Sequence, residues 1–244
     1  MRPILWGLLV FVLCLPLAFV LSLVAAARYP SMDAFTMKLP IDFRAAVAEL
    51  TLRNAGYGKD SAKGIDRAIM FDPESADAWT RRCHGNVDET TYDQAACRKA
   101  ITLEPTASNF NGLGMAQEKA KDYCAAEDSY TGAIRETADS AYCLRNMARA
   151  ALRCGHVGAS VAGFEVAEGL DAKAAADPDD EDDTRSDLVT DREYLAVAYD
   201  RTNQPAKSAA VCIRAHPNWK TCHCELTETG PKCSGDSAAS ASKK

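Results

Sequence analysis

Apolar and small residues recur along the middle of this chain with a period of thirty-four positions. Three pairs of positions carry the period: Leu113 and Met147, Tyr130 and Phe164, and Ala133 and Ala167. A unit of this length is typical of a helix-turn-helix hairpin, which cannot bury its apolar face alone and stacks on its neighbours. The pattern therefore predicts an all-α solenoid of stacked hairpins, whose exposed inner surface is suited to holding another protein.

The period continues in both directions with small changes in length. Counting forward, Ala215 follows Ala167 by forty-eight residues, which is one period plus fourteen. The extra residues fall in the acidic stretch 175–188, which has almost no apolar side chains and is expected to loop out between two units. Counting backward, Ala100 and Ala68 continue the series in steps of thirty-three and thirty-two.

The third unit, FNGLGMAQEKAKDYCAAEDSYTGAI from Phe110, resembles a tetratricopeptide repeat, with its bulky residue, Leu-Gly, Tyr, Ala, aromatic and Ala in order. The first two units end in Ala68–Pro73 and Ala100–Pro105, which are similar to the family's unit-ending Ala-Leu-x-Leu-Asp-Pro. The resemblance implies about five units over residues 42–220, arranged as a right-handed superhelix. It also implies that the first helix of each hairpin lines the concave side and contacts the partner.

On this basis the candidate partner-binding residues are Asn111, Tyr142, Arg145 and Arg149. Tyr142, Arg145 and Arg149 lie at helical spacings on one face, and Asn111 stands one period before Arg145. Some family members clamp a peptide carboxylate with Lys and Asn on successive first helices, and this chain has only part of that set. The alternative is that the two arginines are solvated, with their stems lying on the surface.

Residues 4–27 form an uncharged, apolar segment of twenty-four residues ahead of the repeats. A bilayer-spanning helix needs about twenty apolar residues, whereas a cleaved secretory signal has an apolar stretch of about seven to fifteen. Residues 1–28 are therefore predicted to be a retained signal anchor, followed by a linker over 29–41. The alternative is a signal peptide cleaved after Ala25-Ala26-Ala27, which would leave the chain secreted. Both interpretations place the repeats outside the cytoplasm, although the flanking charges decide the orientation poorly.

Ten cysteines in 244 residues are many for a reducing cytosol and indicate an oxidising compartment. In hairpin geometry Cys83 can pair with Cys97, and Cys124 with Cys154. Four cysteines near the end of the chain are expected to form two more bridges: Cys212, Cys222, Cys224 and Cys233. Cys143 is the candidate for the unpaired cysteine, because Cys154 lies eleven residues further along the same helix, about 16 Å away.

The C-terminal tail, residues 221–244, suggests two other kinds of chemistry. His216, Cys222-His223-Cys224 and Cys233 supply soft ligands for zinc, although their spacing does not match the usual paired knuckles. A redox-active thiol pair is the second alternative, although the Cys-x-x-Cys pattern at a helix start is absent. The residues from Ser234 onward have almost nothing to bury and are expected to be disordered.

Nothing in the sequence indicates an enzyme or a cofactor. The four histidines lack the local acid and nucleophile spacing of a hydrolase, and the acidic run 177–183 lacks the Gly and the distal Glu of a calcium loop. A net charge of −6 argues against binding to nucleic acid. The chain is expected to be a membrane-anchored, extracytoplasmic interaction scaffold. The alternatives are a thiol-handling or metal-binding envelope protein and a purely structural spacer.

Overall fold

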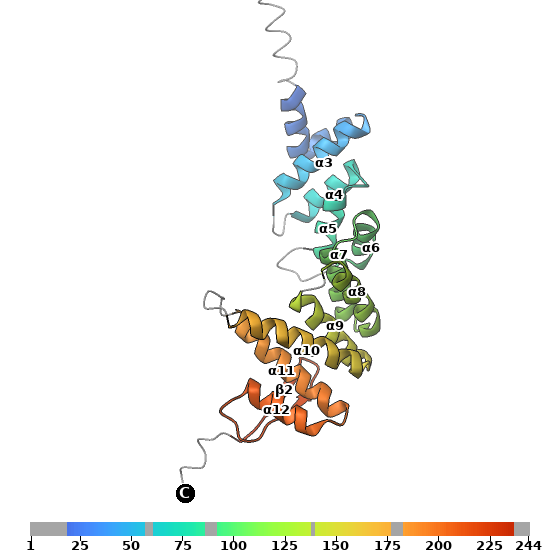
Figure 1. Ribbon diagram of the computed structural model, residues 1–244. Helices are drawn as coiled ribbons and strands as arrows, with labels where there is room; N and C mark the ends of the chain where they lie inside the picture. Colours follow the sequence, from blue (N-terminus) through green and yellow to red (C-terminus); the bar gives the residue numbers. More distant parts are fainter. Residues whose placement is uncertain (1–18, 57–60, 86–91, 138–139, 177–182, 237–244) are drawn as a thin grey trace, which may run out of the picture. The chain divides into compact units, whose positions relative to one another are not determined.

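The structure, a computed structural model, describes most of the chain, namely residues 19–56, 61–85, 92–137, 140–176 and 183–236. The chain divides into two compact units, unit 1 (Met1–Pro105) and unit 2 (Thr106–Lys244), and each is considered by itself. Helices dominate both units, as the periodicity predicted (Figure 1). The described residues form two helical hairpins in unit 1 and three in unit 2.

Unit 1 contains a helix over residues 19–28, η1 (Pro30–Met32), α2 (Asp33–Thr36), α3 (Ile41–Ala55), α4 (Ser61–Phe71), α5 (Ala76–His84) and α6 (Gln94–Leu103). Helix α3 pairs with α4 and α5 with α6, and α4 packs on α5. Val47, Leu52 and Phe71 form the centre of the first hairpin's core. Ala26 and Ala27, which precede that hairpin, are buried in the same core.

Unit 2 contains α7 (Ala107–Lys119), α8 (Tyr123–Glu136), α9 (Ala141–Cys154), α10 (Val157–Ala174), α11 (Asp183–Arg201), α12 (Pro205–Ala215), β1 (His223–Leu226) and β2 (Pro231–Ser234). Each helix from α7 to α11 packs on the next one along the chain. Small residues permit this approach, since a Cβ atom at Gly114 would lie 2.6 Å from the Tyr130 ring. Phe164 stacks on Tyr194 between α10 and α11, and Leu195 is buried beside them.

Short polar side chains set where the helices begin. At the start of α5 the Ser75 hydroxyl accepts a hydrogen bond from the Ala78 backbone N–H. The same cap is made at α6, α7, α8 and α9 by Asp93, Thr106, Asp122 and Ser140. Pro73 and Pro105 stand just before two of these caps, and because proline cannot continue a helix they separate one hairpin from the next.

The C-terminal tail departs from the all-α prediction, because β1 and β2 form an antiparallel pair with Cys224 opposite Cys233. A disulfide joins these two residues, and a turn from Thr227 to Gly230 connects the strands. Cys224 also packs into the core of unit 2. A cross-link and one buried residue therefore hold a segment whose composition does not reveal a strand. Residues 237–244, expected to be disordered, lie outside the described residues.

Two segments expected to be irregular contain helix. The linker 29–41 includes η1 and α2, and Thr36 is fully buried there. Of the acidic insertion 175–188, residues 177–182 lie outside the described residues, and α11 already begins at Asp183. Most of the expected membrane span, up to residue 18, also lies outside them. Within the described ranges, no helix combines the length and the apolar character that a bilayer span requires.

Candidate interaction surface

The four predicted partner-binding residues lie on α7 and α9, the first helices of two successive hairpins in unit 2. Asn111 Oδ1 on α7 accepts a hydrogen bond from Asn146 Nδ2 on α9 at 2.9 Å. The Asn111 amide nitrogen lies 3.4 Å from Met115 Sδ, and the Tyr142 hydroxyl oxygen lies 3.7 Å from the same sulfur. Asn111 and Tyr142 are therefore neighbours on one face, with Met115 between them.

Arg149 is held on this face by a carboxylate from α7. Its Nε and Nη2 donate to the two oxygens of Glu118, each at 2.8 Å, in a bidentate pair. Glu118 also accepts a hydrogen bond from the Tyr130 hydroxyl at 3.0 Å. Burial raises the pKa of Tyr130, and the Glu118 carboxylate raises it further. Burial disfavours the charged form of Arg149, but Glu118 more than compensates, so the pKa of Arg149 is raised. The Arg149 guanidinium therefore stays charged, and its two hydrogen bonds to Glu118 tie α7 to α9.

Arg145 lies inside unit 2, contrary to both of the sequence interpretations. Its Nε donates to Asp191 at 2.6 Å and its Nη1 to Asp187 at 2.8 Å, both on α11. Its Nη2 donates to Asp171 on α10. Only 9% of the side chain is exposed, so its guanidinium is neither solvated nor presented to a partner. The reason is that Asp187, which the sequence analysis assigned to a looped-out insertion, belongs to a helix that packs against α10.

The charges around Arg145 are unequal, because one guanidinium faces three carboxyl groups. Burial raises the pKa of Asp191 to about 7; Arg145 opposes this shift, and the neighbouring Asp171 adds to it. Burial disfavours charge on Arg145 as well, but Asp191 and Asp171 more than compensate and raise its pKa. Asp191 Oδ2 has no hydrogen-bond partner among the described residues. A proton on Asp191 therefore lowers the excess negative charge in this buried cluster.

Tyr142 is the predicted residue with most of its surface still free for contact. It is 49% exposed and stands beside Met115, one helical turn ahead of Arg145 and Asn146. An aromatic ring next to a thioether on a rigid pair of helices is suited to burying an apolar side chain of a partner. Two helical turns further along α9, the Arg149–Glu118 pair presents a positive and a negative charge side by side.

Sequence reasoning missed Glu118, Asn146 and the acids on α10 and α11. Glu118 was detectable, because it stands seven residues after Asn111 and therefore on the same face of α7. Asp187 and Asp191 also carry a signal, since they are four residues apart and face one side of a helix. The sequence analysis did not predict a helix over these residues, because it assigned positions up to 188 to the acidic insertion, whereas α11 begins at Asp183.

The disulfide candidates are all paired. The bridges are Cys83–Cys97 between α5 and α6, Cys124–Cys154 between α8 and α9, Cys212–Cys222, and Cys224–Cys233. Cys143 is buried in α9 and is the unpaired cysteine among the described residues.

The last two bridges touch each other. The Sγ atoms of Cys212 and Cys224 are 3.2 Å apart, and those of Cys212, Cys222 and Cys224 lie within 4.8 Å. Sulfur in a disulfide is not the thiolate that zinc prefers, so metal binding here would require reduction. His216 belongs to a second group, with Glu193 and Cys233, whose ligand atoms lie within 4.8 Å of one another, and its Nε2 lies 2.9 Å from Glu193 Oε1.

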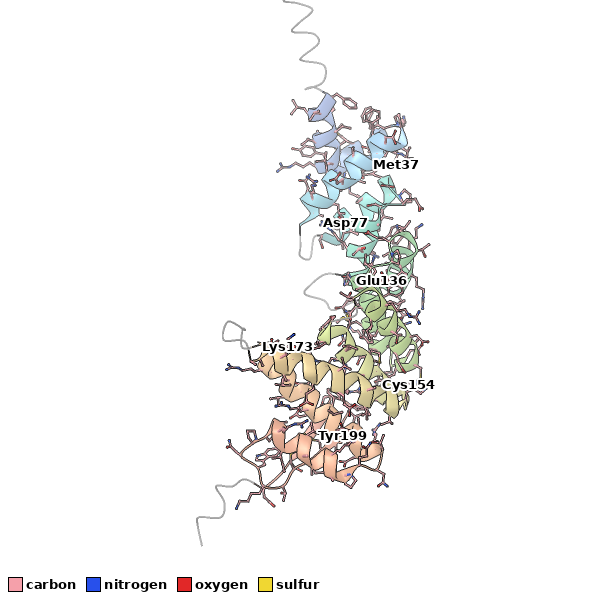
Figure 2. All side chains as sticks on the ribbon, in the orientation of Figure 1. Met37, Asp77, Glu136, Cys154, Lys173 and Tyr199 are labelled. Carbon is pink, nitrogen blue, oxygen red and sulfur yellow. A yellow bond between two sulfur atoms is a disulfide. The ribbon has the colours of Figure 1, made fainter. Side chains whose placement is uncertain are left out.

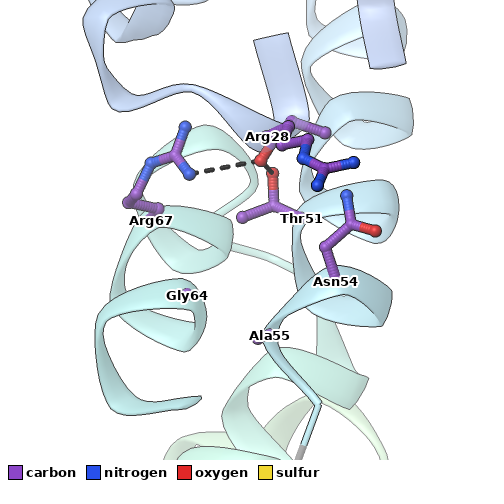
Figure 3. Close-up of a pocket in the computed structure, with 7 residues that line it drawn as sticks. Arg28, Thr51, Asn54, Ala55, Gly64 and Arg67 are labelled. Atoms are coloured by element: carbon purple, nitrogen blue, oxygen red, sulfur yellow. Dashed lines mark hydrogen bonds between the residues drawn. The ribbon is translucent and has the colours of Figure 1, made fainter. Parts of the chain in front are cut away.

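Unit 1 contains a pocket of about 350 Å³ between the helix 19–28 and the first hairpin (Figure 3). Arg67 reaches across it and donates to the Ala27 carbonyl at 3.2 Å, and the Thr51 hydroxyl donates to the same oxygen at 3.3 Å. Arg67 also donates to the Ala26 carbonyl and to Asp33. These polar groups hold the end of the helix 19–28.

Solved structures with similar folds support the repeat interpretation. MamA aligns with a TM-score of 0.55 at 12% identity, over 72% of this chain and 90% of its own. YrrB, a TPR protein with an unusual peptide-binding site, gives 0.55 at 13% identity, over 73% and 88%. The C-terminal part of a TPR repeat-containing protein from Cytophaga hutchinsonii gives 0.51 at 17%, over 75% and 72%. No family model and no curated protein matches the sequence. The chain therefore has a tetratricopeptide-type fold.

Proposed function

We propose that this chain, given its tetratricopeptide-type fold, is a membrane-anchored interaction scaffold that binds a protein or peptide outside the cytoplasm. The binding surface is the α7–α9 face, defined by Met115, Glu118, Tyr142 and Arg149. Asn111, one of the predicted contact residues, is buried beside them. The observation that carries this assignment is the exposed ring of Tyr142 on α9, the helix that the Arg149–Glu118 pair ties to α7. The partner supplies an apolar side chain that covers Tyr142 and Met115.

Affinity capture with matched variants tests this surface. The full chain is solubilised from membranes, and its companions are compared with those of Tyr142→Ala and Val166→Ala. Val166 is a suitable control, because it is equally exposed, at 52%, but lies on α10, a second helix. A companion lost with Tyr142→Ala and kept with Val166→Ala supports the proposal. A companion lost with Val166→Ala alone, or kept by both variants, contradicts it.

The anchor is proposed to be residues 1–28, retained after translocation. Support comes from Ala26 and Ala27, which fill the core of the first hairpin and whose carbonyls accept hydrogen bonds from Arg67. Cleavage after Ala27 would remove both and leave the Arg67 guanidinium with fewer partners. The four disulfides support an oxidising compartment. The intact mass of the protein from membranes tests retention: a chain that begins at Arg28 contradicts it.

A second candidate function, thiol–disulfide exchange, rests on the 3.2 Å contact between Cys212 and Cys224. If an external dithiol reduces the Cys224–Cys233 bridge, the Cys224 thiolate is placed to attack Cys212 and release Cys222 as a thiolate. Turnover of a disulfide-bonded peptide in the presence of a dithiol tests this function. Activity that disappears in Cys222→Ser and in Cys224→Ser favours it over the scaffold, and a rate equal to that of the dithiol alone excludes it.

A further inference from the structure

Exposed apolar side chains gather at the beginning of unit 1. Twelve large apolar side chains are exposed among the described residues, and nine of them fall between positions 19 and 43. We name these nine the apolar platform: Phe19, Val20, Leu21, Val24, Tyr29, Phe35, Met37, Ile41 and Phe43. The other three are spread over three different helices. A concentration of this kind marks a surface that is covered in the working protein.

The platform is held rigidly by the first hairpin. Leu23, Ala26 and Ala27 form one side of the helix 19–28 and pack in the core with α3 and α4. The hairpin covers the end of this helix and leaves Val20 and Val24, nearer its beginning, exposed. The hydrogen bonds from Arg67 to the last carbonyls of this helix, drawn in part in Figure 3, fix its end to α4. The exposed residues are thus part of a packed element.

The short helices after it show an inverted arrangement. Thr36 is fully buried and its hydroxyl donates to the Met32 carbonyl, while its neighbours Phe35 and Met37 are 54% and 42% exposed. Met37, labelled in Figure 2, stands in unit 1 between α2 and α3 along the chain. Asp33 pairs with Arg67 and keeps this segment in place. A buried polar residue between two exposed large apolar residues is an unfavourable arrangement in water. We therefore expect an apolar environment outside the protein to cover this side of the segment.

The composition and the position of the platform favour a lipid surface. It combines aromatic rings, including the amphipathic Tyr29, with the exposed basic residues Arg28 and Lys38, as membrane-interface segments do. Residues 4–18, which are uncharged and apolar, lead directly into Phe19. The platform overlaps the end of the apolar segment 4–27 and follows it, which places it where the proposed anchor leaves the bilayer, and its basic residues suit anionic headgroups.

We propose that the apolar platform lies in the headgroup and upper acyl region of the bilayer and seats the first hairpin on the membrane surface. This inference rests on the proposed anchor, residues 1–28. In this arrangement η1, α2 and the start of α3 contact lipid.

Lipid photolabelling followed by digestion with trypsin tests the proposal. The full chain is reconstituted in vesicles of phosphatidylcholine and phosphatidylglycerol that contain a lipid with a diazirine near the ester carbonyl. Trypsin cleaves after Arg28, Lys38 and Arg44. It therefore separates the anchor (1–28), which also holds the first four platform residues, from two peptides that hold the other five (29–38 and 39–44), here called the platform peptides. We expect adducts on the anchor and on both platform peptides, and none on the peptides that contain Tyr142 or Val166, which are exposed in unit 2.

The outcomes separate this proposal from the one on which it rests. Adducts on peptide 1–28 alone contradict lipid contact by residues 29–44 but leave the proposed anchor intact. If no peptide at all carries an adduct, both proposals are overturned. Platform peptides that are free of lipid but cross-linked to a second copy of the chain assign the surface to a dimer and also overturn the proposal. In Phe35→Ser/Ile41→Ser we expect labelling of 29–44 to fall severalfold while Val166→Ser leaves it unchanged. An unaltered far-ultraviolet circular dichroism spectrum shows that the double variant is folded.

Discussion

The Nε of Arg145 donates to Oδ1 of Asp191 at 2.6 Å, and this buried contact joins α9 to α11 across α10 in unit 2. The Asp191 side chain is fully buried and the Arg145 side chain nearly so. Asp171 and Asp187 form ion pairs with the other two nitrogens of the guanidinium. The contact links two successive hairpins through a charge pair where apolar packing is usual, and the stability of unit 2 therefore depends on it.

Replacing Arg145 by Ala is expected to destabilise unit 2 strongly. The substitution leaves three carboxyl groups facing one another without a cation, and breaking a buried pair in this way costs about 3–5 kcal/mol. Arg192→Ala is the control, because Arg192 lies on α11 next to Asp191, is more exposed than Arg145, and pairs chiefly with the Glu168 carboxylate. Its loss is expected to cost about 1 kcal/mol or less. Urea unfolding measures both, and equal costs for the two variants would contradict the structural role of Arg145.

The raised pKa of Asp191 predicts a specific dependence of stability on pH. Its ordinary value of 3.8 applies to the unfolded chain, and the folded value is about 7. Between these values the folded protein holds a proton that the unfolded chain has released, so the free energy of unfolding falls as the pH rises. The stabilisation is complete below about pH 4 and lost above about pH 7, with a slope of at most about 1.4 kcal/mol per pH unit.

Asp191→Asn tests this dependence, because an amide cannot titrate. Urea unfolding of both proteins at several values between about pH 4 and about pH 8 gives the difference in stability that belongs to Asp191. We expect the free energy of unfolding of the unsubstituted protein to fall relative to that of the variant as the pH rises. A difference that is constant across the range shows that Asp191 does not take up a proton on folding in this window.

The Arg149–Glu118 pair is expected to contribute modestly. The two side chains are 27% and 18% exposed, so solvent screens them and the coupling should be about 0.5–1 kcal/mol. A double-mutant cycle with Arg149→Met and Glu118→Gln measures this coupling through urea unfolding. A coupling energy of zero would mean that the pair does not fix α7 against α9 in solution, and the rigid surface proposed around Tyr142 would lose its basis.

Counting thiols tests the pairing of the cysteines and the retention of the anchor together. Eight of the ten cysteines are paired, which leaves Cys143 and Cys14, the latter inside the predicted anchor. The denatured, unreduced chain is expected to react with two equivalents of a thiol reagent if residues 1–28 are retained, and with one if they are cleaved. The native protein should react slowly at Cys143, because that thiol is buried. Three or more thiols would show that a bridge is open.

The hairpins were predictable because their signal is local. Gly114 faces Tyr130 and Phe164 packs beside Leu195, and such pairs of small and bulky residues repeat in register along the chain. The burial of Arg145 was not predictable from spacing, because its three partners come from other helices, one of which begins inside a segment that reads as a solvated loop. The tail likewise owes its strands to the Cys224–Cys233 bridge, whose pairing depends on the folded geometry.

Photocrosslinking at position 142 in intact cells tests the central claim most directly. A photoreactive phenylalanine replaces Tyr142 in one strain and Val166 in another, and both chains keep their anchor and disulfides. We predict that position 142 crosslinks to one protein companion, and that position 166, equally exposed on a second helix, does not. Crosslinking at position 166 alone, or at neither position, would contradict the assignment of the α7–α9 face as the interaction surface.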